Sequence, residues 1–547
     1  MLRTRDRFPR ALLLLGAIAA GGWLRIRGLA DMPFYGDEYH GIRAANRAIG
    51  EILTRFDSYG THVVLPLLQH VLANTLGPTL VSFRLPALVP GLLCLLLCYP
   101  VARSLVGRAP ALLATVALAA SPIHVYYSRF GRAYSLNILL GLLLVWAVRR
   151  AHTRQWRGFW TVLLVVAPAA LLPYAHLSSA GFDAGLGLAA IGLAWHAYGA
   201  RAGLRALAVF AAAAVLCGLM FLPVFEPLIA YLTKLPEEER ARPDGVLGIA
   251  TLLAGGGYAG IVEAVLLVAG LVLLVRRQRV EGWLLAAAVV GPMVFLGATL
   301  PHGMEYAYAR YLIIALPCIL IVCSWVLVAF FERVVPGPAA SGVGVFAGAA
   351  LVAAVHLGGP LGPRAADSGP FSNTYLAMRD LPAFDRPYVG TPNIYRRIAK
   401  DPQAKRIIEA PPLHSRSVLL YRNYFQTHGK EVLIGLARAK DDLRLSGPSA
   451  FIGDPNVGRK SGAQYLILHR DLRAEVAGYW KWIYGQVWPQ MENVWDRGFM
   501  DRHRSFFIPE ASVKEMADAL EGPLRQQLGP PMYEDDTVVA WRLRRGR

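Results

Sequence analysis

The chain has 547 residues, of which 55% are hydrophobic and 17% are charged, and its mean hydropathy is +0.39. Ordinary soluble proteins are about 45–50% apolar and about 25% charged, so this composition excludes a typical soluble protein and favours a membrane protein. The net charge of +19 would suit nucleic-acid binding in a soluble protein, but most basic residues outside the C-terminal region lie in short loops between apolar runs, so we expect membrane lipids and no nucleic acid as partners.

The apolar runs predict an all-α polytopic membrane bundle. A helix crosses the hydrocarbon layer with about 20 apolar residues. We place eleven spans near residues 10–29, 84–104, 108–127, 134–149, 157–175, 179–198, 204–225, 258–275, 282–300, 311–331 and 340–357. The first span follows MLRTRDRFPR like a signal peptide, but the many later spans indicate an uncleaved anchor. The five cysteines all lie in apolar segments and form no CxxC pair, which gives no sign of zinc or redox chemistry.

Arginine gives the orientation, because it is enriched in the cytoplasmic loops of membrane proteins. With a cytoplasmic N-terminus, every inner loop carries arginine. The residues are Arg3, Arg5, Arg7, Arg10, Arg103, Arg108, Arg149, Arg150, Arg154, Arg157, Arg201, Arg205, Arg276, Arg277, Arg279 and Arg333. Because eleven is odd, the C-terminal region falls on the outer face, which is the periplasmic face of a bacterial inner membrane.

The first outer loop, ADMPFYGDEYHGI, carries an acidic pair at the membrane surface. Asp37 or Glu38 can act there as a general base toward a hydroxyl group, or can hold a divalent cation. Alternatively, the two acids stabilise the N-terminus of the helix that follows. Residues 61–77, THVVLPLLQHVLANTLG, are too short for a span and predict a juxtamembrane helix at the outer surface.

Four arginines lie at the predicted outer ends of spans, where the charge rule expects few. They are Arg84, Arg129, Arg132 and Arg310. The guanidinium group is a fixed fork of donors that suits phosphate, so these residues are candidates to bind a lipid phosphate. The alternative is that each side chain snorkels to lipid headgroups.

Three histidines lie on the same predicted side: His62, His176 and His302. They could join Asp37 or Glu38 in contacting substrate or a divalent metal ion. Their spacing matches no zinc pattern, and histidine is common at membrane interfaces, so the metal remains an open alternative.

The composition changes near residue 358, where charges, prolines and strand-like pieces appear. We expect strands at 406–410, 417–425, 431–436, 463–469 and 537–543, and a helix at 511–528. The chain thus divides into a membrane domain, 1–357, and a C-terminal α/β domain, 358–547, which is long enough to fold by itself.

The order of these motifs resembles glycosyltransferase family 39 and related GT-C-type enzymes, which include protein O-mannosyltransferases and the aminoarabinose transferase acting on lipid A. The likeness rests on GDEYHGI, HVVLPLLQHVLANTLG, FRLPALVPG, SPIHVYYSRFGRAYSL and ARYLIIALP, and is best over residues 10–150. It implies a GT-C-type fold, a polyprenyl-phosphate sugar donor and an outer-face active site. Asp37 matches the essential acid of the first loop, Arg84 matches an arginine of the second span, and Arg310 with Tyr311 matches a late pair near the carrier phosphate. Arg132 and Tyr134 stand where relatives often carry Asp.

The resemblance implies a hexosyl or pentosyl transferase with a lipid, glycan or protein acceptor. The expected mechanism is a single inverting displacement, with Asp37 as base and the arginines holding the departing phosphate. A transporter or flippase of a lipid-linked sugar is the rival, but such proteins place binding sites at mid-membrane on symmetric broken helices. A membrane-anchored binding protein would not need so many spans.

Overall fold

The computed structural model describes most of the chain in separate stretches. These are residues 7–27, 29–30, 38–45, 47–56, 63–77, 79–233, 253, 257–277, 279–299, 310–337, 339–357, 388–411, 418–434, 462–486 and 512–543. The chain forms two compact units, and each is described by itself. The first comprises residues 1–27, 53–64 and 87–377, and the second comprises 28–52, 65–86 and 378–547. The predicted domain boundary at 357/358 stays a prediction.

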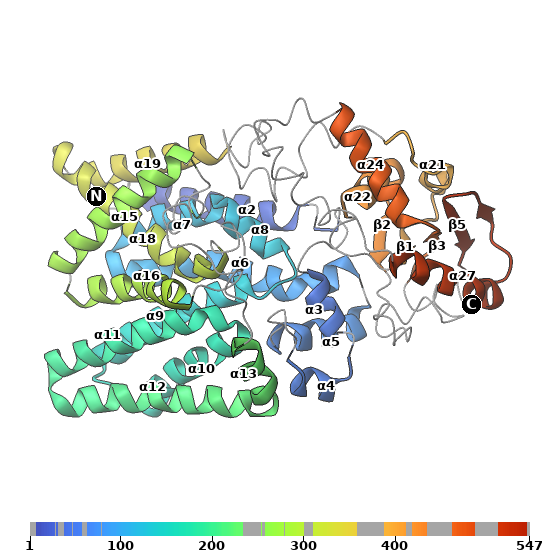
Figure 1. Ribbon diagram of the computed structural model, residues 1–547. Helices are drawn as coiled ribbons and strands as arrows, with labels where there is room; N and C mark the ends of the chain where they lie inside the picture. Colours follow the sequence, from blue (N-terminus) through green and yellow to red (C-terminus); the bar gives the residue numbers. More distant parts are fainter. Residues whose placement is uncertain are drawn as a thin grey trace. The chain divides into compact units, whose positions relative to one another are not determined.

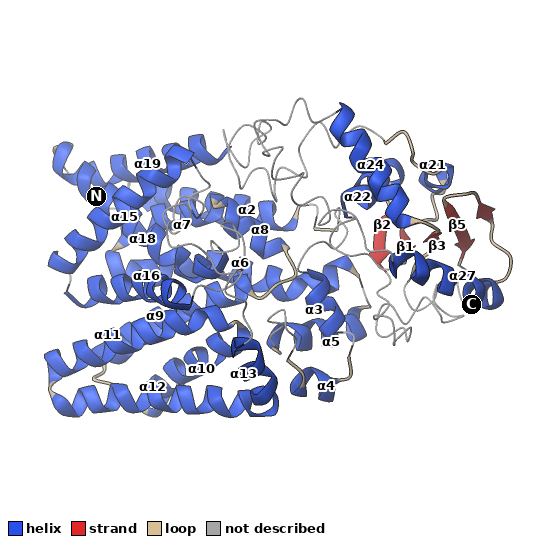
Figure 2. Cartoon of the chain, in the orientation of Figure 1, coloured by secondary structure: helices blue, strands red, loops and turns tan. Residues whose placement is uncertain are grey.

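The first unit is a helical bundle (Figures 1 and 2). Its helices are α2 (Arg7–Ile26), most of α6 (Leu80–Val106), α7 (Arg108–Ala120), α8 (Pro122–Arg129), α9 (Tyr134–Thr153), α10 (Phe159–Ala175), η1 (Leu177–Ser179), α11 (Ala180–Tyr198), α12 (Ala200–Phe221), η2 (Leu222–Val224), α13 (Phe225–Thr233), α15 (Gly257–Arg277), α16 (Arg279–Thr299), η4 (Ile313–Ala315), α18 (Leu316–Val334) and α19 (Ala340–Leu357). A helix lies at each of the eleven predicted spans.

Two differences between the predicted spans and the helices bear on candidate site residues. The span predicted at 108–127 is two helices, α7 and α8, bent by 56° at Ser121, because Pro122 cannot continue the hydrogen-bond ladder of α7. The second span begins at Leu80 instead of 84, so Arg84 lies one turn inside α6.

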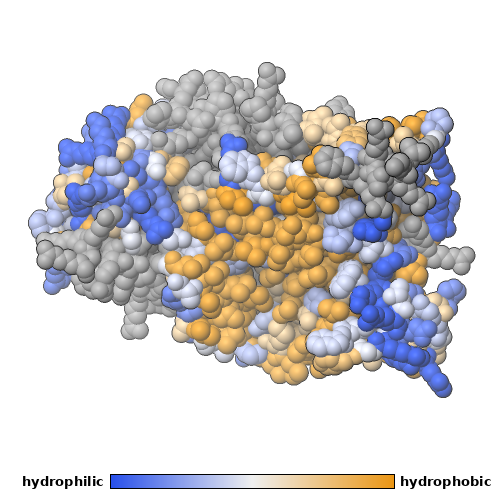
Figure 3. Space-filling view, turned by 180° about the vertical axis from the view of Figure 1, so that it is seen from behind, coloured by the Kyte–Doolittle hydropathy of each residue, from blue (hydrophilic) through white to orange (hydrophobic). Residues whose placement is uncertain are grey.

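By length and composition, seven helices of the described residues can each cross a membrane, or eight if the bent pair is one span. α10 and α19 fall among the shorter apolar helices. Figure 3 shows a broad hydrophobic surface on the molecule, and the bundle exposes large apolar side chains such as Leu207 and Val215 of α12 and Val268 of α15. The chain is therefore a multi-pass membrane protein.

Glycines let the helices of the bundle approach closely. A Cβ atom added to Gly181 would lie 2.2 Å from the Cβ of Phe295, and one added to Gly185 would lie 2.7 Å from the carbonyl oxygen of Ala287. On the facing helix α16, a Cβ atom at Gly291 would lie 2.5 Å from the Gly181 carbonyl oxygen. Small residues at such interfaces are the usual means of packing helices in lipid, so α11 and α16 form a backbone-to-backbone contact.

The second unit combines the first-loop helices with an α/β fold. Its elements are α3 (Glu38–Ala45), most of α4 (Ile49–Thr54), α5 (Val64–Leu76), the first turns of α6, α21 (Asn393–Lys400), β1 (Arg406–Ala410), α22 (Val418–His428), β2 (Glu431–Ile434), β3 (Tyr465–His469), α24 (Leu472–Gln486), α27 (Ser512–Leu528), β4 (Tyr533–Glu534) and β5 (Val538–Arg542). The juxtamembrane helix predicted at 61–77 is α5.

The strands form one sheet in the order β2-β1-β3-β5-β4. β1 pairs in parallel with β2 and β3, whereas β5 runs antiparallel to both β3 and β4. Successive side chains of a strand point to opposite faces of the sheet, and both faces of this sheet are buried. Ile408 and Leu466 pack with Leu520 and Leu524 of α27 on one face. Glu409 and His469 belong to the other face, which contacts α21 and α24 through hydrogen bonds and α22 through ring contacts of His469.

The strand predicted at 417–425 is wrong, because residues 418–425 belong to α22. The buried residues among those described are Leu420, Tyr421, Asn423, Tyr424 and His428, which lie on one face of a helix. The aromatic and apolar content of this stretch suits a strand equally well, and tertiary contacts of this face select the helix.

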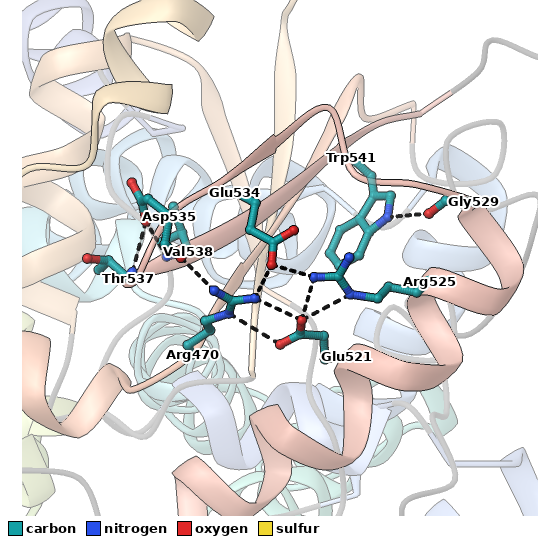
Figure 4. Close-up of polar contacts among 9 residues, drawn as sticks. All are labelled: Arg470, Glu521, Arg525, Gly529, Glu534, Asp535, Thr537, Val538 and Trp541. Carbon is teal, nitrogen blue, oxygen red and sulfur yellow. Dashed lines mark hydrogen bonds and ion pairs between the residues drawn. The ribbon is translucent and has the colours of Figure 1, made fainter.

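Ion pairs join α27 to the β4–β5 hairpin at one edge of the sheet (Figure 4). Arg470 contacts Glu521 and Glu534, and Arg525 contacts the same two carboxylates. The Arg470 guanidinium also donates to the Asp535 carbonyl oxygen at 2.7 Å. The shared carboxylates therefore hold the end of β3, the helix and the hairpin together.

Candidate active site

The break between α7 and α8 exposes helix-end carbonyl groups inside the bundle, and Arg25 of α2 binds them. A helix end leaves carbonyl oxygens without partners from its own backbone. The guanidinium of Arg25, which is fully buried, donates to Leu118 at 2.9 Å and to Ala119 at 3.1 Å. It also donates to Gly21 of its own helix at 2.7 Å. Arg25 thus stabilises the bend.

The same arginine fixes α8 through His124. The guanidinium can only donate, so its bond to Nδ1 of His124 makes Nδ1 the acceptor and leaves the ring proton on Nε2. Ser128, one turn later, donates to the His124 carbonyl oxygen at 2.6 Å and packs against Gly91 of α6. These contacts set the direction of α8, which ends at Arg129.

Two of the predicted phosphate-binding arginines lie at the connection from α8 to α9. Arg129 is half-buried, and the Arg132 side chain is buried. A tight turn brings the Arg132 amide within 2.6 Å of the Phe130 carbonyl oxygen. The connection ends at Tyr134, whose ring centroid lies 4.5 Å from that of Tyr127 on α8. α8 therefore positions both ends of the arginine-bearing connection.

Four predicted or matched residues form one cluster, here called the His176 cluster: Tyr134, His176, Arg310 and Tyr311. The ring of His176 lies 5.0 Å from that of Tyr134 and 5.8 Å from that of Tyr311, measured between centroids. The Arg310 guanidinium lies 5.2 Å over the Tyr311 ring and donates to its hydroxyl oxygen at 3.3 Å. Three distant parts of the chain thus bring an imidazole, a guanidinium and two phenols together.

Local structure holds His176 in this cluster. α10 ends at Ala175, and His176 has extended backbone angles before η1 begins. Its Nδ1 accepts from the Ser178 amide at 3.4 Å and lies 2.8 Å from the Ser178 hydroxyl oxygen. In the neutral ring, the proton therefore lies on Nε2, which is a donor suited to an anion.

The second unit contains two further predicted site residues, Glu38 and Arg84, which bind each other. Arg84 binds Glu38 through two parallel bonds, from Nε to Oε1 at 2.9 Å and from the terminal nitrogen to Oε2 at 2.8 Å. A third nitrogen donates to the Leu29 carbonyl oxygen at 2.6 Å. The side chains of Glu38 and Arg84 are only 0% and 4% exposed, so this is a fully desolvated, bidentate ion pair.

Several predicted residues lie outside the described parts of the chain: Asp37, His62 and His302. Within the described parts, no three His, Cys, Asp or Glu residues are grouped to hold a metal ion. His176 contacts Tyr134, Tyr311 and Ser178, which do not make the donor set of a divalent cation.

Sequence reasoning missed the role of Arg25. The signal was present, because Arg25 lies within the first predicted span, and an ionisable residue there needs a buried partner. The partner could not be read from the sequence, since His124 and the carbonyl groups of α7 lie more than 90 residues away.

A family model described as dolichyl-phosphate-mannose-protein mannosyltransferase matches residues 63–231. The structure is similar to apo ArnT from Cupriavidus metallidurans, with a TM-score of 0.51 and 12% identity over 85% of this chain and 94% of that one. This chain has the GT-C fold. The resemblance predicted from the motifs is thereby confirmed, as is the fold class of a helical membrane bundle with a C-terminal α/β domain.

Two further solved structures are similar at lower scores. ArnT bound to undecaprenyl phosphate gives a TM-score of 0.49 at 13% identity, over 85% of this chain and 94% of that chain. The Archaeoglobus fulgidus oligosaccharyltransferase in complex with Zn and sulfate gives 0.43 at 12% identity, over 86% of this chain and 69% of that one. No curated protein matches the chain.

Proposed function

We propose that this protein transfers a sugar from a polyprenyl-phosphate donor to a hydroxyl group of a lipid, glycan or protein acceptor on the outer face of the membrane. The His176 cluster carries the proposal. Arg310 supplies a guanidinium fork, and Tyr311 and His176 supply further donors, which together suit a phosphate group. The matched family model supports the donor class, since its description names a sugar linked to a lipid phosphate.

The proposed reaction is one in-line displacement. The acceptor oxygen attacks the anomeric carbon, and Asp37 takes the proton of the acceptor hydroxyl. A new carbon–oxygen bond forms as the bond to the carrier phosphate breaks, and its electron pair leaves with the phosphate oxygen. Arg310, with Arg129 and Arg132, stabilises the negative charge that develops on the phosphate. Attack opposite the leaving group inverts the anomeric configuration.

Glu38 and Arg84 have a positioning role in this proposal. Both Glu38 oxygens accept hydrogen bonds from Arg84, so Glu38 is poorly suited to take a proton. Asp37 directly precedes Glu38 in the chain, and α3 begins at Glu38. The ion pair therefore anchors the start of α3 next to the proposed base. We assign Arg84 to this anchor in preference to direct contact with phosphate.

Substitutions of Arg310 test the phosphate site. Loss of one charge-assisted contact costs about 1.5–3 kcal/mol, which corresponds to about 10- to 150-fold in transfer from a polyprenyl-phosphate sugar. Arg310→Ala should lose this full factor. Arg310→Lys should recover only part, because lysine lacks the fork. Arg333→Ala is the matched control, because Arg333 is exposed in the last turn of α18.

The alternatives give different results in the same assay. If Arg310 only snorkels to headgroups, lysine should replace it fully. If the protein is a flippase, the labelled sugar stays attached to its carrier and no glycosylated acceptor forms. Wild-type transfer by both Arg310 variants would refute the phosphate site.

A further inference from the structure

A glutamate of the C-terminal sheet binds the N-terminus of helix α6. The Glu431 carboxylate, at the start of β2, accepts from the Leu80 amide at 3.2 Å. Leu80 is the first residue of α6, and both residues belong to the second unit. A negative charge at this position is favourable, because the first amides of a helix lack partners in the helix and carry a partial positive charge.

The rest of the α6 N-terminus shows why Glu431 is needed. The Thr79 hydroxyl accepts from the Ser82 amide at 3.0 Å, and the Ser82 hydroxyl accepts from the Thr79 amide at 2.9 Å. This reciprocal capping satisfies two amides. It does not reach the Leu80 amide, which Glu431 binds instead. The cap of α6 is thus completed by a residue more than 300 positions later in the chain.

The sheet holds Glu431 in place. Arg406 of β1 is its direct neighbour in the parallel ladder. The Arg406 Nε atom donates to the second carboxylate oxygen of Glu431 at 2.6 Å. One carboxylate oxygen of Glu431 therefore accepts a hydrogen bond from the sheet, and the other accepts one from α6.

α6 connects this cap to the proposed catalytic loop. Arg84 lies one helical turn after Leu80 and binds Glu38. Gln69 of α5 donates to the Phe83 carbonyl oxygen at 2.9 Å, which fastens the same turn of α6 from another side. We propose that Glu431 is a positioning residue for sugar transfer: through α6 and Arg84 it holds the start of α3, beside Asp37. This role rests on the proposed function, and it assigns the C-terminal domain a part in the reaction.

A charge swap separates this role from a role in the sheet alone. Arg406→Glu with Glu431→Arg keeps opposite charges facing each other across β1 and β2, but arginine cannot accept from the Leu80 amide. We expect kcat for transfer to fall about 5- to 30-fold in both Glu431→Ala and the swap, as loss of a helix cap predicts. The donor KM should change less than about twofold. Glu431→Gln keeps an acceptor and should retain most of the activity.

Glu534→Ala is the matched control. Glu534 is also paired with arginines (Figure 4). It lies on β4, however, at the opposite edge of the sheet from β2. It should leave kcat unchanged. Hydrogen exchange of the amides at residues 80–84 gives a readout independent of activity, and it should be faster in Glu431→Ala and in the swap than in Glu534→Ala.

If the charge swap of Arg406 and Glu431 has wild-type kcat and wild-type hydrogen exchange, the positioning role of Glu431 is wrong, while the proposed sugar transfer still stands. Failure of the proposed function has a different signature, because the unsubstituted protein would then form no product from any polyprenyl-phosphate sugar tested. In that case, the exchange of residues 80–84 still decides whether Glu431 caps α6.

Discussion

Removing Arg84 alone, and then Arg84 together with Glu38, gives a quantitative test of how strongly the buried Glu38–Arg84 pair depends on both charges. Arg84→Met leaves the fully buried Glu38 carboxylate without this counter-charge, which should cost about 3–5 kcal/mol. Glu38→Leu with Arg84→Met removes both charges. The remaining cost is about 1–3 kcal/mol, because the Leu29 carbonyl oxygen loses the donor at 2.6 Å. The double variant should therefore be more stable than Arg84→Met.

The assay is thermal unfolding in detergent micelles followed by tryptophan fluorescence, and the readout is the order of the Tm values. We expect the highest Tm for the wild type, a lower Tm for the double variant and the lowest Tm for Arg84→Met. Arg149→Met is the control, because the Arg149–Glu281 pair is about a quarter exposed and such pairs contribute about 0–1 kcal/mol. A double variant with a Tm at or below that of Arg84→Met would refute the reasoning.

Three further predictions concern other parts of the chain. Burial disfavours a charged His469, but the carboxylates of Glu475 and Glu409 outweigh it and raise its pKa to about 10. The stability that protonated His469 gains from the two carboxylates is thus fully present below about pH 6.5 and is lost as the pH rises through about 10. The Tm of the C-terminal domain should therefore fall over that window, and His469→Gln should make the fall smaller. Arg25→Met should lower Tm much more than Arg27→Met, since Arg25 binds three buried carbonyl oxygens whereas Arg27 is exposed. A reporter active only in the cytoplasm, fused after Arg547, should stay inactive, and an active fusion would contradict the predicted orientation.

The helical part of the fold could be predicted because its signal is local. Apolar length places a helix at each expected span, and strands β1 and β3, which we predicted at 406–410 and 463–469, follow from alternation. The bend at Ser121 was missed, although Pro122 marks it, because apolar composition continues through both helices. The misassigned residues 417–425 show the same limit, since tertiary contacts choose between helix and strand there.

The candidate site could be predicted only as a set of residue types. The sequence marked Arg84 and Arg310 equally, as arginines at outer ends of spans. The structure separates them: Arg84 binds a carboxylate 46 residues earlier, and Arg310 lies over the Tyr311 ring next to His176. Residue type shows that a fork of donors is present, but its partner depends on contacts between distant segments.

The buried Glu409–His469–Glu475 group was not predicted either. His469 contacts both carboxylates at 2.9 Å, and Tyr395 donates to Glu409 at 2.9 Å. These residues come from β1, β3, α21 and α24, and each alone looks like an ordinary polar residue in a strand or helix. Only the order of the sheet brings them together, and hydrogen bonding then makes their burial tolerable.

The most direct test of the account is release of free polyprenyl phosphate by the purified protein, with a polyprenyl-phosphate sugar as donor and a mixture of envelope lipids and glycans as acceptor. We predict that the wild-type protein releases the carrier phosphate only when acceptor is present. Asp37→Asn, checked for an unchanged Tm, should still bind the donor but release none, because the amide cannot take the acceptor proton. Release by Asp37→Asn at the wild-type rate would contradict the proposed base, and transport of intact donor without release would contradict sugar transfer itself.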